Sequence, residues 1–177
     1  MFAATPLLFI FELYQKNKIP FENVGKTILG VMYVALPLSL LMVVLFENHQ
    51  YRPNLLLGIF LLIWSNDTFA YLVGSQIGKN KLFPRISPGK TWEGTIGGGI
   101  CTLIVAFLLS LIFKEIELKD WMAIGLIAAV FGTIGDLVES MLKRSKGVKD
   151  SGNFMPGHGG ALDRFDAFIF VLPFIGL

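Results

Sequence analysis

The chain has 177 residues, of which 54% are hydrophobic and only 16% are charged, with a formal net charge of +2 and a mean hydropathy of +0.65. An ordinary soluble domain carries about 25% charged residues, and a small one buries only part of its chain. The composition therefore excludes an ordinary soluble domain and indicates an integral membrane protein. The single cysteine, Cys101, excludes an intramolecular disulfide.

Apolar segments recur along the chain at about the 20-residue length of a transmembrane helix. Four of them, at 26–46, 54–74, 94–113 and 121–137, reach or approach that length, and shorter ones lie at 2–13 and 162–177. We predict an all-α, polytopic transmembrane helix bundle with five to six membrane segments, in a single domain over residues 1–177. Because both end segments are too short to cross a bilayer, we expect a fragment that lacks N-terminal helices.

The basic residues are distributed unevenly over the five connections between these segments. They number 3, 1, 4, 2 and 5 in chain order, which accounts for all 15 lysines and arginines. Alternating high and low counts match the positive-inside rule if the first, third and fifth connections are cytoplasmic. We therefore expect the 79–90 loop and the 140–166 stretch at the cytoplasmic face of a membrane, such as a bacterial inner membrane.

Polar residues interrupt the segment at 54–74. An unpaired Asp67 inside a membrane costs about 2.5–3.5 kcal/mol on insertion scales, so a cation or a polar partner is expected there. Asn66 directly precedes Asp67, and Tyr71, four residues after Asp67, lies on the same helix face as Asp67. Asn66 and Asp67 are therefore candidate site residues, and the alternative is an interhelical hydrogen bond that fixes packing.

The next loop contains a candidate phosphate site at residues 87–94. We expect a turn at Pro88–Gly89 and a cap on the following helix from Thr91 or Ser87. Lys90 and Glu93 would then stand at the helix entrance, where backbone N–H groups and the helix dipole favour an anion. The spacing is not that of a P-loop.

The end of the segment at 121–137 carries further charged residues. One helix face carries Asp136, then Glu139 or Ser140, then Lys143, because these residues are three or four positions apart. A carboxylate near the end of a transmembrane helix is costly without a partner, which makes it a functional candidate. The alternative is an interfacial Asp136 that pairs with Lys143 or Arg144 for topology alone.

The stretch from 140 to 166 concentrates cations, carboxylates and glycines between apolar segments. Two glycines beside His158 allow backbone N–H groups to approach a ligand closely. Asp163 and Asp166 are three residues apart and share a helix face, and carboxylate oxygens suit Mg²⁺ together with substrate phosphates. The pattern favours a phosphate and metal site at a membrane surface. The alternative is a glycine-rich turn followed by a salt-bridged helix start.

Three motifs bring these residues into one pattern. The longest runs Ser140-x-Leu142-Lys143-Arg144, four residues, Lys149-Asp150-x-Gly152, then Pro156-x-His158-Gly159-Gly160-x-x-Asp163-Arg164-x-Asp166. Two others are Asn66-Asp67-x-x-Ala70-Tyr71, with Gly78-Lys79 after it, and Ser87-Pro88-x-Lys90-Thr91-x-Glu93-Gly94. Over most of the chain, these motifs resemble the phosphatidate cytidylyltransferases, or CDP-diacylglycerol synthases. Met155 and Ala161 depart mildly from that pattern, and the family normally has further N-terminal helices.

The resemblance implies an enzyme that transfers CMP from CTP to phosphatidate and releases CDP-diacylglycerol and pyrophosphate. It implies Mg²⁺ in a two-metal site, with either Mg²⁺ or a monovalent cation as the second ion. The metal ligands it implies are Asp136 and Asp163 first, then Asp150 and Asp166. It implies phosphate binding by Lys143, Arg144, Lys149 and Arg164, and substrate binding by Ser140.

The same resemblance assigns the rest of the site. His158 would orient or protonate the pyrophosphate, and the catalytic set is Asp136, Asp163, Lys149, Asp150 and His158. The far wall of the site would consist of Asn66, Asp67, Lys90 and Glu93. The expected partners are CTP, phosphatidate and the lipid bilayer, with a homodimer as an option and no nucleic acid.

Two other classes of protein compete with this interpretation. One is another CTP-using lipid enzyme, such as an isoprenoid-alcohol kinase or a synthase for ether-linked lipids. The other is a cation transporter with Asp67 and Asp136 as intramembrane ion sites. A transporter does not need a basic, glycine-rich cytoplasmic loop, and paired halves are not found in the sequence.

Overall fold

The computed structural model describes residues 4–15, 19–47, 50–148, 151–152, 160 and 162–175. The helices of this part are α1 (Ala4–Tyr14), α2 (Pro20–Leu45), α3 (Pro53–Ile77), α4 (Trp92–Ile112), α5 (Leu118–Ser145) and α6 (Leu162–Ile175). The strands are β1 (Phe46–Glu47), β2 (Gln50–Tyr51), β3 (Lys81–Phe83) and β4 (Ser87–Thr91). Within the described residues, α2, α3, α4 and α5 are long and apolar enough to cross a membrane. The predicted all-α, polytopic bundle is confirmed, and α1 and α6 correspond to the short end segments.

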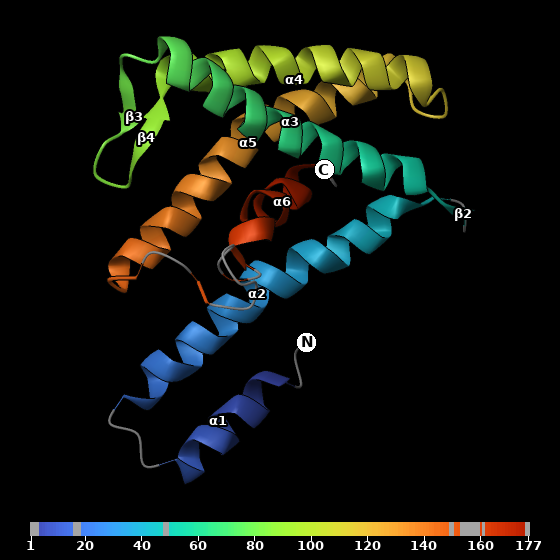
Figure 1. Cartoon of the computed structure of the whole chain (residues 1–177). Helices are drawn as coiled ribbons and strands as arrows, with labels where there is room; N and C mark the ends of the chain where they lie inside the picture. Colours follow the sequence, from blue (N-terminus) through green and yellow to red (C-terminus); the bar gives the residue numbers. More distant parts are fainter. Residues whose placement is uncertain are drawn as a thin grey trace.

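Helices α3, α4, α5 and α6 form the main packed body (Figure 1). α3 packs along α4, α4 against α5, and α5 against α6, while α2 also contacts α6. At the end of the bundle away from the hairpin, Trp121 is fully buried, and its Nε1 donates a hydrogen bond to the carbonyl of Phe113 at 3.4 Å. Many large apolar side chains remain exposed along the four long helices, for example Leu29, Leu57 and Ile104. A lipid environment accounts for this exposure.

Glycines permit the close helix contacts that position the polar residues. A Cβ added at Gly98 of α4 would lie 2.8 Å from the Cβ of Ala70 on α3. On α5, a Cβ at Gly135 would lie 2.6 Å from the Cβ of Phe170 on α6. Neither distance leaves room for a larger residue, so α3 approaches α4, and α5 approaches α6, through these glycines.

Strands β3 and β4 form an antiparallel hairpin that the sequence prediction did not include. Lys81 pairs with Thr91 and Phe83 with Ser87, with an irregular register between the two pairs. The turn lies at 84–86 and not at Pro88–Gly89, since the amide of Ile86 donates to the carbonyl of Phe83 at 3.1 Å. Pro84 occupies the turn position that its fixed φ favours, which leaves 87–91 free to form a strand.

The hairpin is attached firmly to the start of α4. Of the two predicted caps, Thr91 is the one used, because its side chain accepts from the amide of Gly94 at 3.2 Å. Glu93 accepts from the backbone amides of Lys79 and Asn80 at 3.1 and 3.2 Å. Its carboxylate also accepts from the side-chain amide of Asn80 at 2.7 Å. These bonds fix the direction of the hairpin relative to α3 and α4.

Candidate active site

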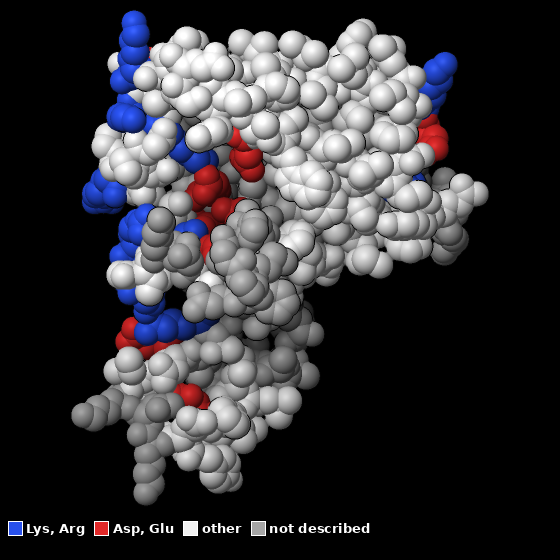
Figure 2. All heavy atoms as spheres, viewed as in Figure 1, with Lys and Arg blue, Asp and Glu red and all other residues white. Residues whose placement is uncertain are grey.

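A cavity of about 700 Å³ lies between the hairpin, α3, α5 and α6. Glycines at the end of α3 and in β4 form part of its wall, namely Gly74, Gly78 and Gly89. Figure 2 shows acidic side chains recessed in a hollow, with lysines and arginines along its left side. The charged residues that line the cavity are Asp67, Lys81, Lys90, Asp136, Asp163 and Asp166.

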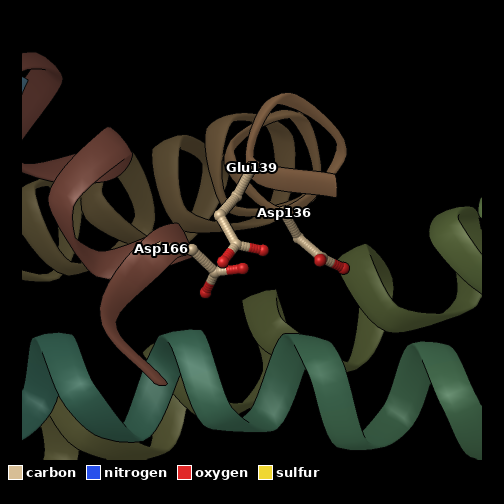
Figure 3. Close-up of side chains that lie close together, drawn as sticks. All are labelled: Asp136, Glu139 and Asp166. Carbon is tan, nitrogen blue, oxygen red and sulfur yellow. The ribbon is translucent and has the colours of Figure 1, made fainter. Parts of the chain in front are cut away.

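Three carboxylates of α5 and α6 converge in this region. One ligand oxygen from each of Asp136, Glu139 and Asp166 lies within 4.8 Å of the others. Asp136 and Glu139 are three residues apart on α5, and Asp166 faces them from α6 (Figure 3). The close packing of α6 at Gly135 holds Asp166 at this distance.

Glu139 is the least accessible member of this group. Its relative exposure is 1%, and no N–H or hydroxyl group of the described residues donates to its Oε1. Its Oε2 forms an ion pair with Lys143, one turn later on α5. A buried carboxylate oxygen without a partner is costly, and a cation in contact with it removes that cost. Three hard oxygen donors are the ligand type that suits Mg²⁺.

Lys143 also joins α5 to the start of α6. Its Nζ lies 2.8 Å from Oδ1 of Asp163 and also pairs with Glu139, so Lys143 bridges these two carboxylates. Asp163 accepts further from the backbone amides of Ser151, at 3.0 and 3.2 Å, and of Gly160, at 2.7 Å. Burial opposes ionisation, but these hydrogen bonds, that from Lys143 foremost, hold the pKa of the Asp163 carboxyl well below its usual range.

These contacts distinguish Asp163 from the acidic trio. An ionised carboxylate offers about four lone-pair directions, and N–H donors occupy both oxygens of Asp163. The structure therefore brings two predicted metal ligands, Asp136 and Asp166, together with Glu139. Asp163 instead connects α5 with residues 151 and 160.

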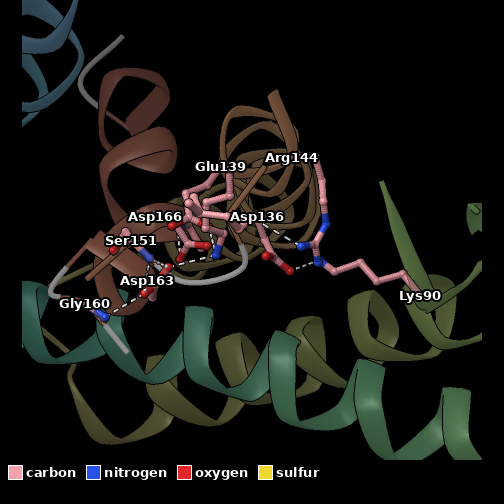
Figure 4. Close-up of polar contacts among 11 residues, drawn as sticks. Lys90, Asp136, Glu139, Arg144, Ser151, Gly160, Asp163 and Asp166 are labelled. Carbon is pink, nitrogen blue, oxygen red and sulfur yellow. Dashed lines mark hydrogen bonds and ion pairs between the residues drawn. The ribbon is translucent and has the colours of Figure 1, made fainter. Parts of the chain in front are cut away.

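Lys90 reaches across from β4 to α5. It forms an ion pair with Asp136, as Figure 4 shows, and both residues line the cavity. Asp67 lines the same cavity from α3. Asn66 is buried and donates a hydrogen bond to Oγ1 of Thr133 at 3.3 Å, which joins α3 to α5. For Asn66, the structure thus shows the interhelical hydrogen bond that was the alternative to a site role.

The remaining predicted residues lie in different settings. Glu93 holds the hairpin through the amides of Lys79 and Asn80. The Nη1 of Arg144 donates to the carbonyl of Val148 at 3.3 Å. Ser140 is half-buried on α5 beside Glu139. Outside the described part of the chain lie Lys149, Asp150, His158 and the side chain of Arg164.

Two charged residues at this site were absent from the predicted set. Glu139 could have been chosen, because it stands three residues after Asp136 and four before Lys143 on one helix face. Lys81 could not, because its place in the cavity depends on a hairpin that the sequence did not reveal.

Comparisons with known proteins give this geometry a context. The sequence model described as "Cytidylyltransferase family" matches residues 1–177. Proteins named phosphatidate cytidylyltransferase are similar over 179 aligned residues: 42% identical in Staphylococcus aureus (strain COL), 41% in Staphylococcus saprophyticus and 37% in Staphylococcus epidermidis. Each alignment covers 100% of this chain and 67% of the relative. The chain belongs to the cytidylyltransferase family.

Proposed function

We propose that this protein is a phosphatidate cytidylyltransferase, which transfers CMP from CTP to phosphatidate and releases pyrophosphate. The observation that carries the proposal is the buried Glu139 carboxylate, with one unpartnered oxygen, beside Asp136 and Asp166. Amines flank this trio, and the cavity lies among helices that can cross a membrane. Relatives with this activity in their names match the whole chain. The predicted enzyme class agrees with these comparisons.

We propose Mg²⁺ as the metal of this site, with Asp136, Glu139 and Asp166 as its protein ligands. The fit rests on three carboxylate oxygens within 4.8 Å and on the unpartnered oxygen of Glu139. When bound, Mg²⁺ supplies neutralisation of phosphate charge and a fixed orientation for in-line displacement. A second ion, either Mg²⁺ or a monovalent cation, stays a prediction, as do metal roles for Asp150 and Asp163.

In the proposed reaction, an oxygen of the phosphatidate phosphate attacks the α-phosphorus of CTP. A new P–O bond forms, the bond to the bridging oxygen of the β-phosphate breaks, and pyrophosphate leaves with that electron pair. Both reactants are anionic, so the protein's main tasks are positioning and charge stabilisation. For these tasks we propose Lys90, which lines the cavity, and Lys143, which pairs with Glu139 and Asp163 beside it. Phosphate contacts by Arg144, Lys149 and Arg164, and pyrophosphate orientation by His158, stay predictions.

The membrane setting gives each substrate its own route. Phosphatidate would arrive laterally from the bilayer, since the apolar faces of the long helices are exposed. CTP would arrive from the aqueous side, and the distribution of basic residues favours the cytoplasm for that side. A homodimer remains a prediction that cross-linking of the protein in membranes tests.

The decisive assay measures transfer of radiolabelled CMP from CTP to phosphatidate in detergent micelles, with and without Mg²⁺. Glu139→Gln keeps the side-chain shape but removes the charge, and we expect activity to fall by about two orders of magnitude or more. Glu117→Gln is the matched control, because Glu117 directly precedes α5 at the end of that helix away from the trio. It is exposed and pairs with Lys119 at 2.9 Å. Wild-type protein that forms no CDP-lipid would refute the function. Glu139→Gln with normal Mg²⁺-dependent activity would refute the metal assignment alone.

A further inference from the structure

The hairpin brings two lysines to one wall of the cavity, and their surroundings differ. Lys90 of β4 is paired with Asp136 of α5. Lys81 of β3 lines the same cavity and is exposed, and its ammonium group has no ion-pair or hydrogen-bond partner among the described residues. It is therefore a cation of the cavity whose charge no described carboxylate neutralises directly.

The backbone that carries Lys81 is well fixed. The carbonyl of Asn80, immediately before it, accepts a hydrogen bond from the amide of Trp92 at 2.9 Å. The amide of Asn80 donates to the carboxylate of Glu93 at 3.2 Å. Across the hairpin, Lys81 pairs with Thr91, which is 4% exposed and caps α4. The ammonium group thus stands on a rigid base, while the long side chain can adjust to a ligand.

We propose that Lys81 is an anion-binding residue of the active site and contacts a phosphate group of an incoming substrate. The inference rests on the proposed function, which supplies two ligands of this chemistry, the triphosphate of CTP and the phosphate of phosphatidate. Lys90 and Lys143 already have carboxylate partners, so an entering phosphate must compete for them. Lys81 needs no such exchange, because only water has to leave its exposed ammonium group when a phosphate binds.

The alternative to substrate binding is that an exposed lysine at a membrane surface serves only as a topological anchor. Arg85 provides the comparison, because it lies at the tip of the same hairpin, is exposed, and is not among the residues that line the cavity. If charge on the hairpin mattered only for anchoring, loss of either residue would have the same effect.

The test measures steady-state kinetics of Lys81→Gln, Lys81→Arg and Arg85→Gln in mixed micelles, with CTP and the surface fraction of phosphatidate varied separately. We expect Lys81→Gln to raise the KM for one substrate by about tenfold to a hundredfold, the loss typical of one charge-assisted hydrogen bond. Lys81→Arg should recover much of that loss, and Arg85→Gln should behave like the wild type. Thermal unfolding of each variant in the same detergent verifies folding.

This design distinguishes the triphosphate of CTP from the phosphate of phosphatidate as the group that Lys81 contacts. A raised KM for CTP alone assigns Lys81 to the triphosphate, and a raised surface KM for phosphatidate alone assigns it to the lipid. Unchanged KM values in Lys81→Gln, or equal losses in Arg85→Gln, overturn the inference and leave the proposed function standing. Wild-type protein without CMP transfer overturns both.

Discussion

The contact at Gly135 offers a direct test of how the acidic trio is assembled. A Cβ at this position would lie 2.6 Å from Cβ of Phe170 and 3.2 Å from Cα of Ala167, both on α6. Carbon atoms prefer separations of about 3.5–4.0 Å, so Gly135→Ala must move α6 away from α5 by about 1 Å. Asp166 lies on that part of α6 and would move away from Asp136. When a mutation outside the reacting groups misplaces a catalytic group by about 1 Å, the rate can fall by about a hundredfold.

Gly132→Ala is the matched control on the same helix. Its added Cβ would meet Nδ2 of Asn66 at 3.7 Å and Cγ2 of Val171 at 3.8 Å, which are ordinary contacts. We expect CMP transfer to fall about a hundredfold in Gly135→Ala and to change little in Gly132→Ala, with a higher Mg²⁺ requirement in the former. Equal, near-normal activity and Mg²⁺ dependence in both variants would show that the spacing of α5 and α6 does not control the trio.

Three further changes probe the contacts around the site. Lys143→Met leaves Glu139 without its partner, so we expect thermal unfolding in detergent to show a loss of about 3–5 kcal/mol, the range for a broken buried pair. Lys119→Met, at an exposed and solvent-screened pair, should leave thermal unfolding almost unchanged. Glu93→Ala should lower CMP transfer by releasing the hairpin, and Glu93→Gln should retain part of it, because the amide oxygen still accepts; equal losses would contradict this role. Asp163→Asn should reduce stability near neutral pH, and the difference should vanish as the pH falls below the normal carboxyl range and through the lowered pKa of Asp163; a difference that does not vary with pH would contradict the ionic role.

Much of the helical framework was predictable because a membrane span has a length and a composition that the sequence displays directly. The four long segments became α2 to α5. The β3–β4 hairpin was not predictable in the same way, because residues 81–91 contain two prolines and a glycine, which indicate a loop. Its strands form because Glu93 and Thr91 attach the loop to α3 and α4, which is a tertiary effect.

The candidate site shows the same division. Spacing predicted that Asp136 and Lys143 share a face of α5 and that Asp163 and Asp166 begin a helix. Spacing carries no information about how α5 and α6 rotate against each other. That rotation brings Asp166 to Glu139 and directs Asp163 toward the amides of Ser151 and Gly160.

The charges around the cavity indicate what a cation at the proposed metal site would change for two anionic substrates. Among the described residues, the carboxylates at or beside the cavity are Asp67, Asp136, Glu139, Asp163 and Asp166. The amines there are Lys81, Lys90 and Lys143. With every group ionised, the carboxylates exceed the amines by two, so this part of the site repels phosphates until positive charge is added. One divalent cation at the trio balances the excess, and it also weakens the hold of Asp136 on Lys90, because two cations then share one carboxylate. The lysine so released stands on the hairpin wall with Lys81, where a phosphate can bind both.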